Sequence, residues 1–220
     1  MMRTAIWAAT IAAAGSVAVS SQQKTPADWT WRTDAPATLG GGEAVGPASW
    51  HFVTMPPGWH VTTGPGALLY PAADNTARGN FRIEAEIFLF PGTSQEEYGI
   101  FLGGAALEPA RAPAWIAFVV RRDGRAGILR RASGHVVPIR DWAANEAVVP
   151  HPDGTSGTAK NVLAVDVAPR EITFSANGTP VVTIPRADVQ PDGVVGLRIG
   201  AGLNLHVSTF DLTRRLAPPK

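Results

Sequence analysis

Two glutamates stand two residues apart in the run NFRIEAEIFLF, which covers residues 80–90. Apolar and polar residues alternate along this run, so it has the period of a β-strand, and Glu84, Glu86 and Arg82 share one face. Two carboxylates about 5 Å apart serve retaining glycosidases as nucleophile and as acid and base. The alternative interpretation is an ordinary solvated face on which Arg82 balances its acidic neighbours.

A second polar row lies near the C-terminus, in the run GLNLHVSTF at residues 202–210. On a strand, Asn204, His206 and Ser208 share a face. If this strand lies near the earlier one, His206 approaches both glutamates and supplies a general acid or base. A single structural hydrogen bond accounts for the histidine equally well. No two-histidine-plus-carboxylate spacing accompanies it, so the sequence predicts no metal site.

Aromatic rings suggest a different chemistry, which is sugar binding without cleavage. The apolar C–H faces of a sugar stack on flat rings while its hydroxyls bond to nearby polar groups. We expect Tyr98, Trp115 and Trp142 at strand ends or in loops, with Trp142 in a long connection at 141–158, where it would act as a lid. Core or loop packing is the alternative for each ring. The predicted ligand-binding residues are therefore Arg82, Tyr98, Trp115, Trp142 and Asn204.

An arginine cluster flanks the Asp123-Gly124 dipeptide, and its members are residues 121, 122, 125, 130 and 131. Such a cluster could recognise an anionic glycan or a phosphate. A solvated hairpin tip would carry the same residues.

Around a dozen short apolar runs must position these side chains, and Gly, Pro, Asn or Asp bounds each run. No long helical period interrupts them. The dipeptides Asp123-Gly124 and Asn177-Gly178 suit the two-residue type I′ turns of β-hairpins. The pattern predicts an all-β chain with minimal helix, folded as a two-sheet antiparallel β-sandwich.

The first 21 residues have the features of a secretory signal peptide, with Arg3 at the start, an apolar stretch at 5–19 and small residues before the cleavage point. Removing them takes away one basic residue, so the formal charge of +1 becomes 0 (1 − 1). A neutral chain gives no electrostatic reason to bind nucleic acid or a membrane surface. The absence of cysteine excludes disulfides and thiolate sites. We predict a secreted or periplasmic protein with an arm at 22–47, a sandwich at 48–216 and a tail at 217–220.

The C-terminal half, NVLAVDVAPREITFSANGTPVVTI followed by DGVVGLRIG and LHVSTFDL, resembles the end of a concanavalin A-like jelly roll. The runs NFRIEAEIFLF and YGIFLGG resemble the early strands of its 3-keto-disaccharide hydrolase-type branch and of laminin-G-like domains. The resemblance covers roughly residues 50–212. It implies a sandwich whose concave sheet carries a glycan site, and relatives that include hydrolases, lectins and protein-interaction modules.

The leading functional prediction is carbohydrate binding on the concave sheet. The alternative is a hydrolase of the 3-keto-disaccharide type that uses Glu84 or Glu86 with His206, and a third is a laminin-G-like interaction module. Laminarinase-type glucanases of this fold carry a third acidic residue on the strand, and here that position is Phe88 or Leu89. No cofactor is predicted. A calcium requirement stays open, because calcium sites in this fold have no fixed sequence spacing. The oligomeric state also stays open.

Overall fold

The structure is a computed structural model that describes residues 26–39 and 48–215. This part of the chain is built from β-strands and one short 3-10 turn, η1 (Arg186–Asp188). The described residues include no helix long and apolar enough to cross a membrane. The predicted signal peptide, the C-terminal tail and much of the predicted arm lie outside the described residues.

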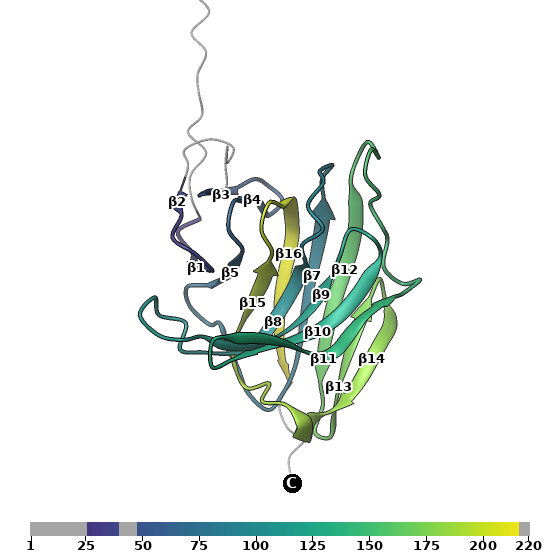
Figure 1. Ribbon diagram of the computed structural model, residues 1–220. Helices are drawn as coiled ribbons and strands as arrows, with labels where there is room; N and C mark the ends of the chain where they lie inside the picture. The colour runs from purple at the N-terminus through teal and green to yellow at the C-terminus, as the bar shows by residue number, and fades with distance from the viewer. Residues whose placement is uncertain (1–25, 40–47, 216–220) are drawn as a thin grey trace, which may run out of the picture.

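The strands form two sheets packed face to face, which confirms the predicted sandwich (Figure 1). Neighbouring strands pair antiparallel, apart from the short parallel pair formed by β2 and β3. In spatial order, the first sheet contains β1 (Trp29–Thr33), β5 (Ala67–Pro71), β15 (Gly193–Ile199), β8 (Tyr98–Ala105), β9 (Ala114–Val120), β10 (Arg125–Ala132) and β11 (His135–Ala144), and β6 (Thr76–Ala77) also pairs with β15.

The second sheet carries the early and closing strands together. Its spatial order is β14 (Thr179–Pro185), β13 (Glu171–Ala176), β12 (Ala159–Val167), β7 (Asn80–Leu89), β16 (Asn204–Arg215), β4 (Trp59–Thr63), β3 (Ser49–Thr54) and β2 (Thr38–Leu39). Strand β7 lies between β12 and β16, so the predicted neighbourhood of the early and closing strands is confirmed.

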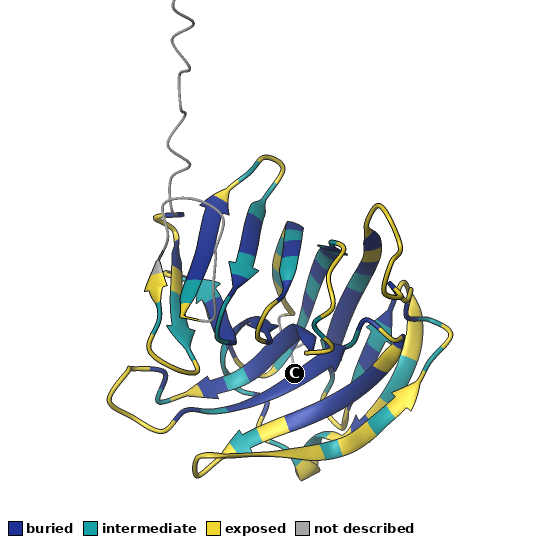
Figure 2. Ribbon diagram, turned by 45° about the horizontal axis from the view of Figure 1, so that its top comes forward, coloured by how far each residue is buried: buried dark blue, intermediate teal, exposed yellow. Residues whose placement is uncertain are grey.

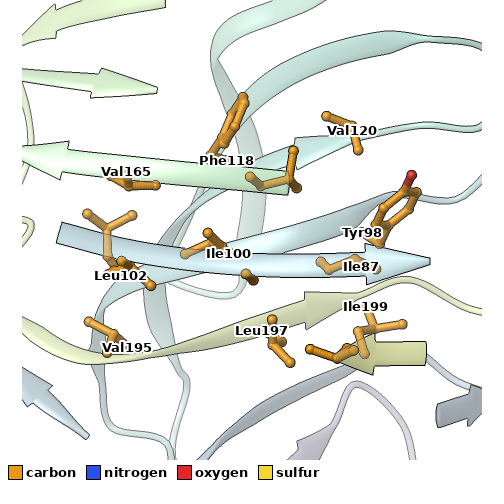
Figure 3. Close-up of a cluster of buried hydrophobic side chains, with 14 of the residues drawn as sticks. Ile87, Tyr98, Ile100, Leu102, Phe118, Val120, Val165, Val195, Leu197 and Ile199 are labelled. Atoms are coloured by element: carbon orange, nitrogen blue, oxygen red, sulfur yellow. The ribbon is translucent and has the colours of Figure 1, made fainter. Parts of the chain in front are cut away.

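The core fills the space between the sheets. Along β7 every second residue is buried and the others are partly exposed, as the sequence alternation requires. The core includes Ile87 of the second sheet and Ile100 and Leu197 of the first (Figure 3). Strand β1 belongs to the predicted arm, and Trp29 makes edge contacts with Phe52, Trp59 and Phe210. This part of the arm is therefore a strand of the sandwich.

The strands β8 and β9 are buried on both faces, whereas β11 is exposed along most of its length (Figure 2). In β9, Ile116 and Phe118 join the core between the sheets. The alternate residues Trp115 and Ala117 join a second buried cluster. Because side chains alternate along a strand, this second cluster covers the outer face of the first sheet.

The two hairpins differ in their turns. Asn177 and Gly178 both have positive φ, 50° and 80°, as a type I′ turn demands. At the other hairpin only Gly124 has positive φ, 81°, and its N–H donates to the carbonyl oxygen of Arg121. The prediction of a two-residue turn there is wrong, because the loop has three residues and ends in a left-handed glycine.

The predicted long connection begins later than expected, because β11 continues to Ala144. Its first part, residues 145–151, is anchored by side chains. Arg122 donates to the carbonyl oxygen of His151 at 3.1 Å, and Asn161 exchanges hydrogen bonds of 2.9 and 3.0 Å with the backbone of Val149. Because Trp142 belongs to β11, the prediction that it lies in a loop is wrong.

Candidate functional site

The outer face of the second sheet brings together three of the predicted residues, Arg82, Glu84 and Glu86. All three are partly exposed positions of β7, alternating with buried apolar residues. Arg82 donates to Glu84 at 2.5 Å and also pairs with Asp166 of β12. The hydrogen bond to Glu84 contributes most to raising the pKa of the Arg82 guanidinium.

Each glutamate of this face has a cationic partner. Glu84 pairs with Arg82, and Lys160 of β12 lies 3.2 Å from Glu86. On the far side of the row, Arg215 donates to Asp166 at 2.6 Å. Glu84 thus belongs to a chain of ion pairs that runs through Arg82 and Asp166 to Arg215, and Glu86 forms a separate pair with Lys160, as the solvated-face interpretation expects.

Strand β16 places His206 on the same face. His206 pairs in register with Phe88, and their ring centroids are 6.2 Å apart. Beyond it the register shifts between Val207 and Thr209, so that Thr209 pairs with Glu86. This bulge inserts one extra residue and adds two hydroxyl side chains beside the histidine.

A hollow of about 540 Å³ opens over this region, and we call it the outer-face hollow. Two partly exposed rings, Phe88 and Phe90, line it together with polar side chains. Its full lining is Pro57, Glu86, Phe88, Phe90, Thr158, His206, Ser208 and Thr209.

Three polar atoms of β16 and β4, one of them in His206 of the hollow lining, have no partner among the described residues. The Nδ1 atom of His206, the Oδ1 atom of Asn204 and the Oγ1 atom of Thr62 are shielded from solvent and make no hydrogen bond to any residue that the structure describes. Asn204 and Thr62 are cross-strand partners in β16 and β4. Buried polar atoms are seldom left unpaired in native proteins, and functional sites are one reason for the exceptions.

The remaining predicted residues lie elsewhere. Tyr98 is only 1% exposed and points into the core, where its hydroxyl accepts a hydrogen bond from Asn161 at 3.1 Å (Figure 3). Tyr98 begins β8, so it lies at a strand end as expected, and its burial supports the packing alternative. Trp115 and Trp142 belong to the cluster on the outer face of the first sheet, where the Arg121 guanidinium lies 3.8 Å from the Trp142 ring centroid. The predicted site residues divide between two opposite faces and the core.

The arginine cluster also divides. Arg122 is buried and donates to the carbonyl oxygens of Phe90 and Ser94 at 3.1 and 3.2 Å, so it ties loops together. Arg125 lies 3.3 Å from Asp123 at the turn. These contacts are structural, and they separate the buried Arg122 from the exposed Arg125.

The sequence reasoning did not select Phe88 and Phe90 as site residues, although a signal was present. The alternation of β7 places both large rings on its polar face, where the rest of the strand carries Arg82, Glu84 and Glu86. The hydroxyls of Ser208 and Thr209 gave no such signal, because a bulge is a property of the strand pairing. Within the described ranges, no group of three or more His, Asp or Glu side chains could hold a metal ion.

No model of a known protein family matches the chain, and no curated protein sequence matches it. Solved structures do match. The carbohydrate-binding module CBM66 from Bacillus subtilis superposes with a TM-score of 0.56 at 11% identity, covering 81% of this chain and 99% of the module. A protein of unknown function with a galectin-like fold from Bacillus subtilis has the same TM-score and identity, covering 86% of this chain and 91% of that one.

An enzyme shares the fold as well. A glycoside hydrolase family 16 endo-glucanase from Bacteroides ovatus matches with a TM-score of 0.54 at 11% identity, covering 84% of this chain and 94% of its own. The predicted fold is confirmed, and the chain is a concanavalin A-like jelly roll. At such identities the similarity defines the fold and leaves the function to the residues of the site.

Proposed function

We propose that the protein binds a carbohydrate in the outer-face hollow and does not cleave it. The observation that supports this proposal most strongly is a pair of partly exposed rings, Phe88 and Phe90. They lie in a hollow that polar side chains also line. A sugar ring stacks its C–H face on such a surface. Its hydroxyls then bond to Glu86, His206 and Thr209, which lie at the same hollow.

Binding is favoured over the hydrolase alternative by the partners of the acidic residues. Glu84 and Glu86 are both engaged in ion pairs with cations of the same face. His206 pairs in register with Phe88, while Thr209 and Asp211 stand opposite the two glutamates. The hydrolase needs a carboxylate that is available to act on a reacting group, and carboxylates engaged in ion pairs support a binding role instead.

Binding is also favoured over a protein-interaction module of the laminin-G type. That alternative needs a contiguous exposed apolar patch. The exposed large apolar residues of the described chain are Val136, Val137 and Val149. Val136 and Val137 are consecutive in β11 and point to opposite faces, so they do not form one patch.

We further propose that binding takes place in the periplasm or outside the cell. The support is the N-terminal sequence, in which a basic residue precedes an apolar stretch and small residues.

The proposal is tested by a glycan-array screen of the protein, with every glycan that binds assayed for cleavage. Phe88→Ala removes one stacking ring and should weaken binding about fivefold or more, since aromatic contacts of this kind contribute about 1 kcal/mol or more. The control is Trp142→Phe, which changes a ring on the other sheet. Equal affinity of native and Phe88→Ala protein would refute the assignment, and cleavage would restore the hydrolase alternative.

A further inference from the structure

A buried pair of basic side chains, Arg122 and His151, connects two segments that line the outer-face hollow. Arg122 is 3% exposed and His151 is 2% exposed. The Nη1 atom of Arg122 donates to the Nδ1 atom of His151 at 3.1 Å, and the other hydrogen bonds of Arg122 to described residues go to backbone carbonyl oxygens. Arginine is seldom buried without an anionic partner, so this neutral surrounding is unusual.

The hydrogen bonds of the pair define where the histidine carries its proton. A guanidinium only donates, so the Nδ1 atom of His151 accepts and carries no proton. The Nε2 atom lies 3.1 Å from the carbonyl oxygen of Gly157, which only accepts, so Nε2 carries the proton. Both bonds form together only while the imidazole is neutral.

The pair holds two residues of the hollow in place. Arg122 donates to the carbonyl oxygen of Phe90 at 3.1 Å, and the bond from His151 to Gly157 fixes the residue directly before Thr158. Phe90 and Thr158 both line the hollow. Residues 152–158 are exposed, so the buried ring of His151 anchors this segment to the rest of the fold.

We propose that Arg122 and His151 are positioning residues of the outer-face hollow, and that they make carbohydrate binding there sensitive to acid. The proposal rests on the proposed function of the hollow. Protonation of Nδ1 replaces the acceptor by a donor and places a second positive charge beside the buried guanidinium. The pair then separates, and Phe90 and the segment 152–158 lose their common anchor.

The direction of the pH dependence follows from proton linkage. A histidine released from the pair takes up a proton below about pH 6.5, whereas the paired ring has no free position for a second proton. Each pH unit below this value therefore raises the ratio of open to closed pairs up to tenfold. Binding in the hollow should weaken as the pH falls, because the open pair no longer positions Phe90 and Thr158.

The carboxylates of the surrounding elements do not compensate the second charge. Glu97 pairs with Arg198, and Asp123 pairs with Arg125. Asp153 accepts a hydrogen bond from Gln95 at 3.4 Å. The ionisable groups of the elements around the pair are Glu96, Glu97, Tyr98, Arg121, Asp123, Arg125, Glu146, Asp153 and Lys160.

The first test needs no ligand. The backbone amide signals of Phe90, Gly157 and Thr158 are followed in ¹H–¹⁵N spectra of the full chain from pH 7.5 to pH 4.5. We expect them to change together along one titration curve in the native protein. In His151→Gln, which has no ring to protonate, the curve should be absent. The matched control is His135→Gln, because His135 is exposed in β11, and it should titrate as the native protein does.

The second test reads the glycan array at both pH values. Native protein should bind its glycans about threefold or more weakly at pH 4.5 than at pH 7.5, and His151→Gln should lose most of this difference. The variant retains His206 of the hollow. A pH dependence that persists in His151→Gln therefore belongs to another group, and it would reject the role of the pair.

Two further results would overturn the proposal. These are amide signals of the native protein that stay in place down to pH 4.5 while the protein is folded, and equal array binding at both pH values. An array without any bound glycan would refute the proposed function of the hollow, and the amide titration would still decide whether the pair opens. Circular dichroism at each pH verifies that the native protein and each variant are folded.

Discussion

Phe88 and Phe90 occupy positions of β7 that the strand alternation assigns to the polar face. Packing in the core between the sheets does not explain these two rings, because the core contains the alternate residues Ile87 and Leu89. Both rings line the outer-face hollow, beside a histidine and two hydroxyl side chains. Partly exposed rings among hydrogen-bonding groups suit a ligand that is apolar on its faces and polar at its rim, which describes a sugar.

Tyr98 gives a pH-dependent prediction. Burial raises the pKa of Tyr98 to about 12, and burial is also the main cause of the raised pKa of Tyr70. The unfolded chain loses these protons near pH 10, whereas the folded protein keeps the Tyr98 proton up to about pH 12. The unfolded state therefore binds fewer protons in this interval, and the free energy of unfolding falls as the pH rises through it.

The chain has two tyrosines, so tyrosinate absorbance follows both without interference. We expect the absorbance of the folded protein to rise well above pH 10, and urea unfolding to show lower stability at pH 11 than at pH 9. Tyr98→Phe should remove most of the tyrosine-linked part of this loss. Complete ionisation of the folded protein near pH 10 would contradict the burial of Tyr98.

Asn161 gives a prediction about stability. Its side chain is fully buried and bonds to the Tyr98 hydroxyl, to the Val149 backbone and to Asn177. Asn161→Ala leaves these groups without their partner, and we expect the free energy of unfolding to fall by about 2–4 kcal/mol. Urea denaturation measures the change. The matched control is Asn145→Ala, which removes one bond to the Ala147 N–H and should cost about 1 kcal/mol or less.

The sequence predicted well which face of a strand a residue occupies where one face of that strand is solvated. Arg82, Glu84 and Glu86 share a face as expected, because β7 alternates cleanly. It predicted Tyr98 poorly, because β8 is buried on both faces and its residues form a continuous apolar run without alternation. For Trp115 the sequence likewise left core packing as one of two alternatives, since both faces of β9 are covered and the strand does not alternate.

At the scale of elements, the hollow depends on how the hairpin of β3 and β4 meets the bulge of β16. Gly58 in the hairpin turn has a φ of +90°, and a Cβ atom there would lie 2.0 Å from the carbonyl oxygen of Val207. Pro57, which precedes Gly58, and Ser208, which follows Val207, both line the hollow. The turn and the bulge therefore fix one side of the candidate site together.

Gly58→Ala tests this contact. The new methyl group collides with backbone, and the residue also adopts a left-handed conformation, so we expect a loss of about 3 kcal/mol or more in the free energy of unfolding. Gly178→Ala is the control, because Gly178 has a φ of +80° with nothing within 4 Å of a Cβ atom. It should cost about 1–2 kcal/mol. Equal losses in chemical denaturation would show that the Gly58 contact has no effect of its own.

Elements were predicted more reliably than their ends. Apolar runs bounded by turn residues identified most strands, and Asn177-Gly178 gave the expected turn. The Asp123-Gly124 turn differed because the same dipeptide also suits a three-residue loop, in which only the glycine is left-handed. Trp142 was placed in a loop because the exposed strand β11 lacks the alternation that marks a strand with one buried face.

For the whole molecule, the sandwich offers two outer faces with different chemistry. The second sheet carries the outer-face hollow beside a chain of ion pairs, and the first sheet carries the buried cluster that contains Trp115, over whose ring lies Arg198, which donates to Asp34 and Glu97. The same fold occurs in a carbohydrate-binding module and in an endo-glucanase. The fold could be predicted from the sequence. Which outer face carries the candidate site could be decided only from the strand pairing and its register.

The central claim is that a carbohydrate binds over Phe88 and Phe90. The most direct measurement is a titration of the protein with the tightest-binding glycan of the array, followed by backbone amide shifts in ¹H–¹⁵N spectra. We predict that the largest shifts fall on residues 86–90 and 206–209 and on the turn at 55–58, and that Phe88→Ala moves the titration midpoint to a glycan concentration about fivefold higher or more. Shifts confined to the first sheet, or no saturable shift with any glycan, would contradict the account.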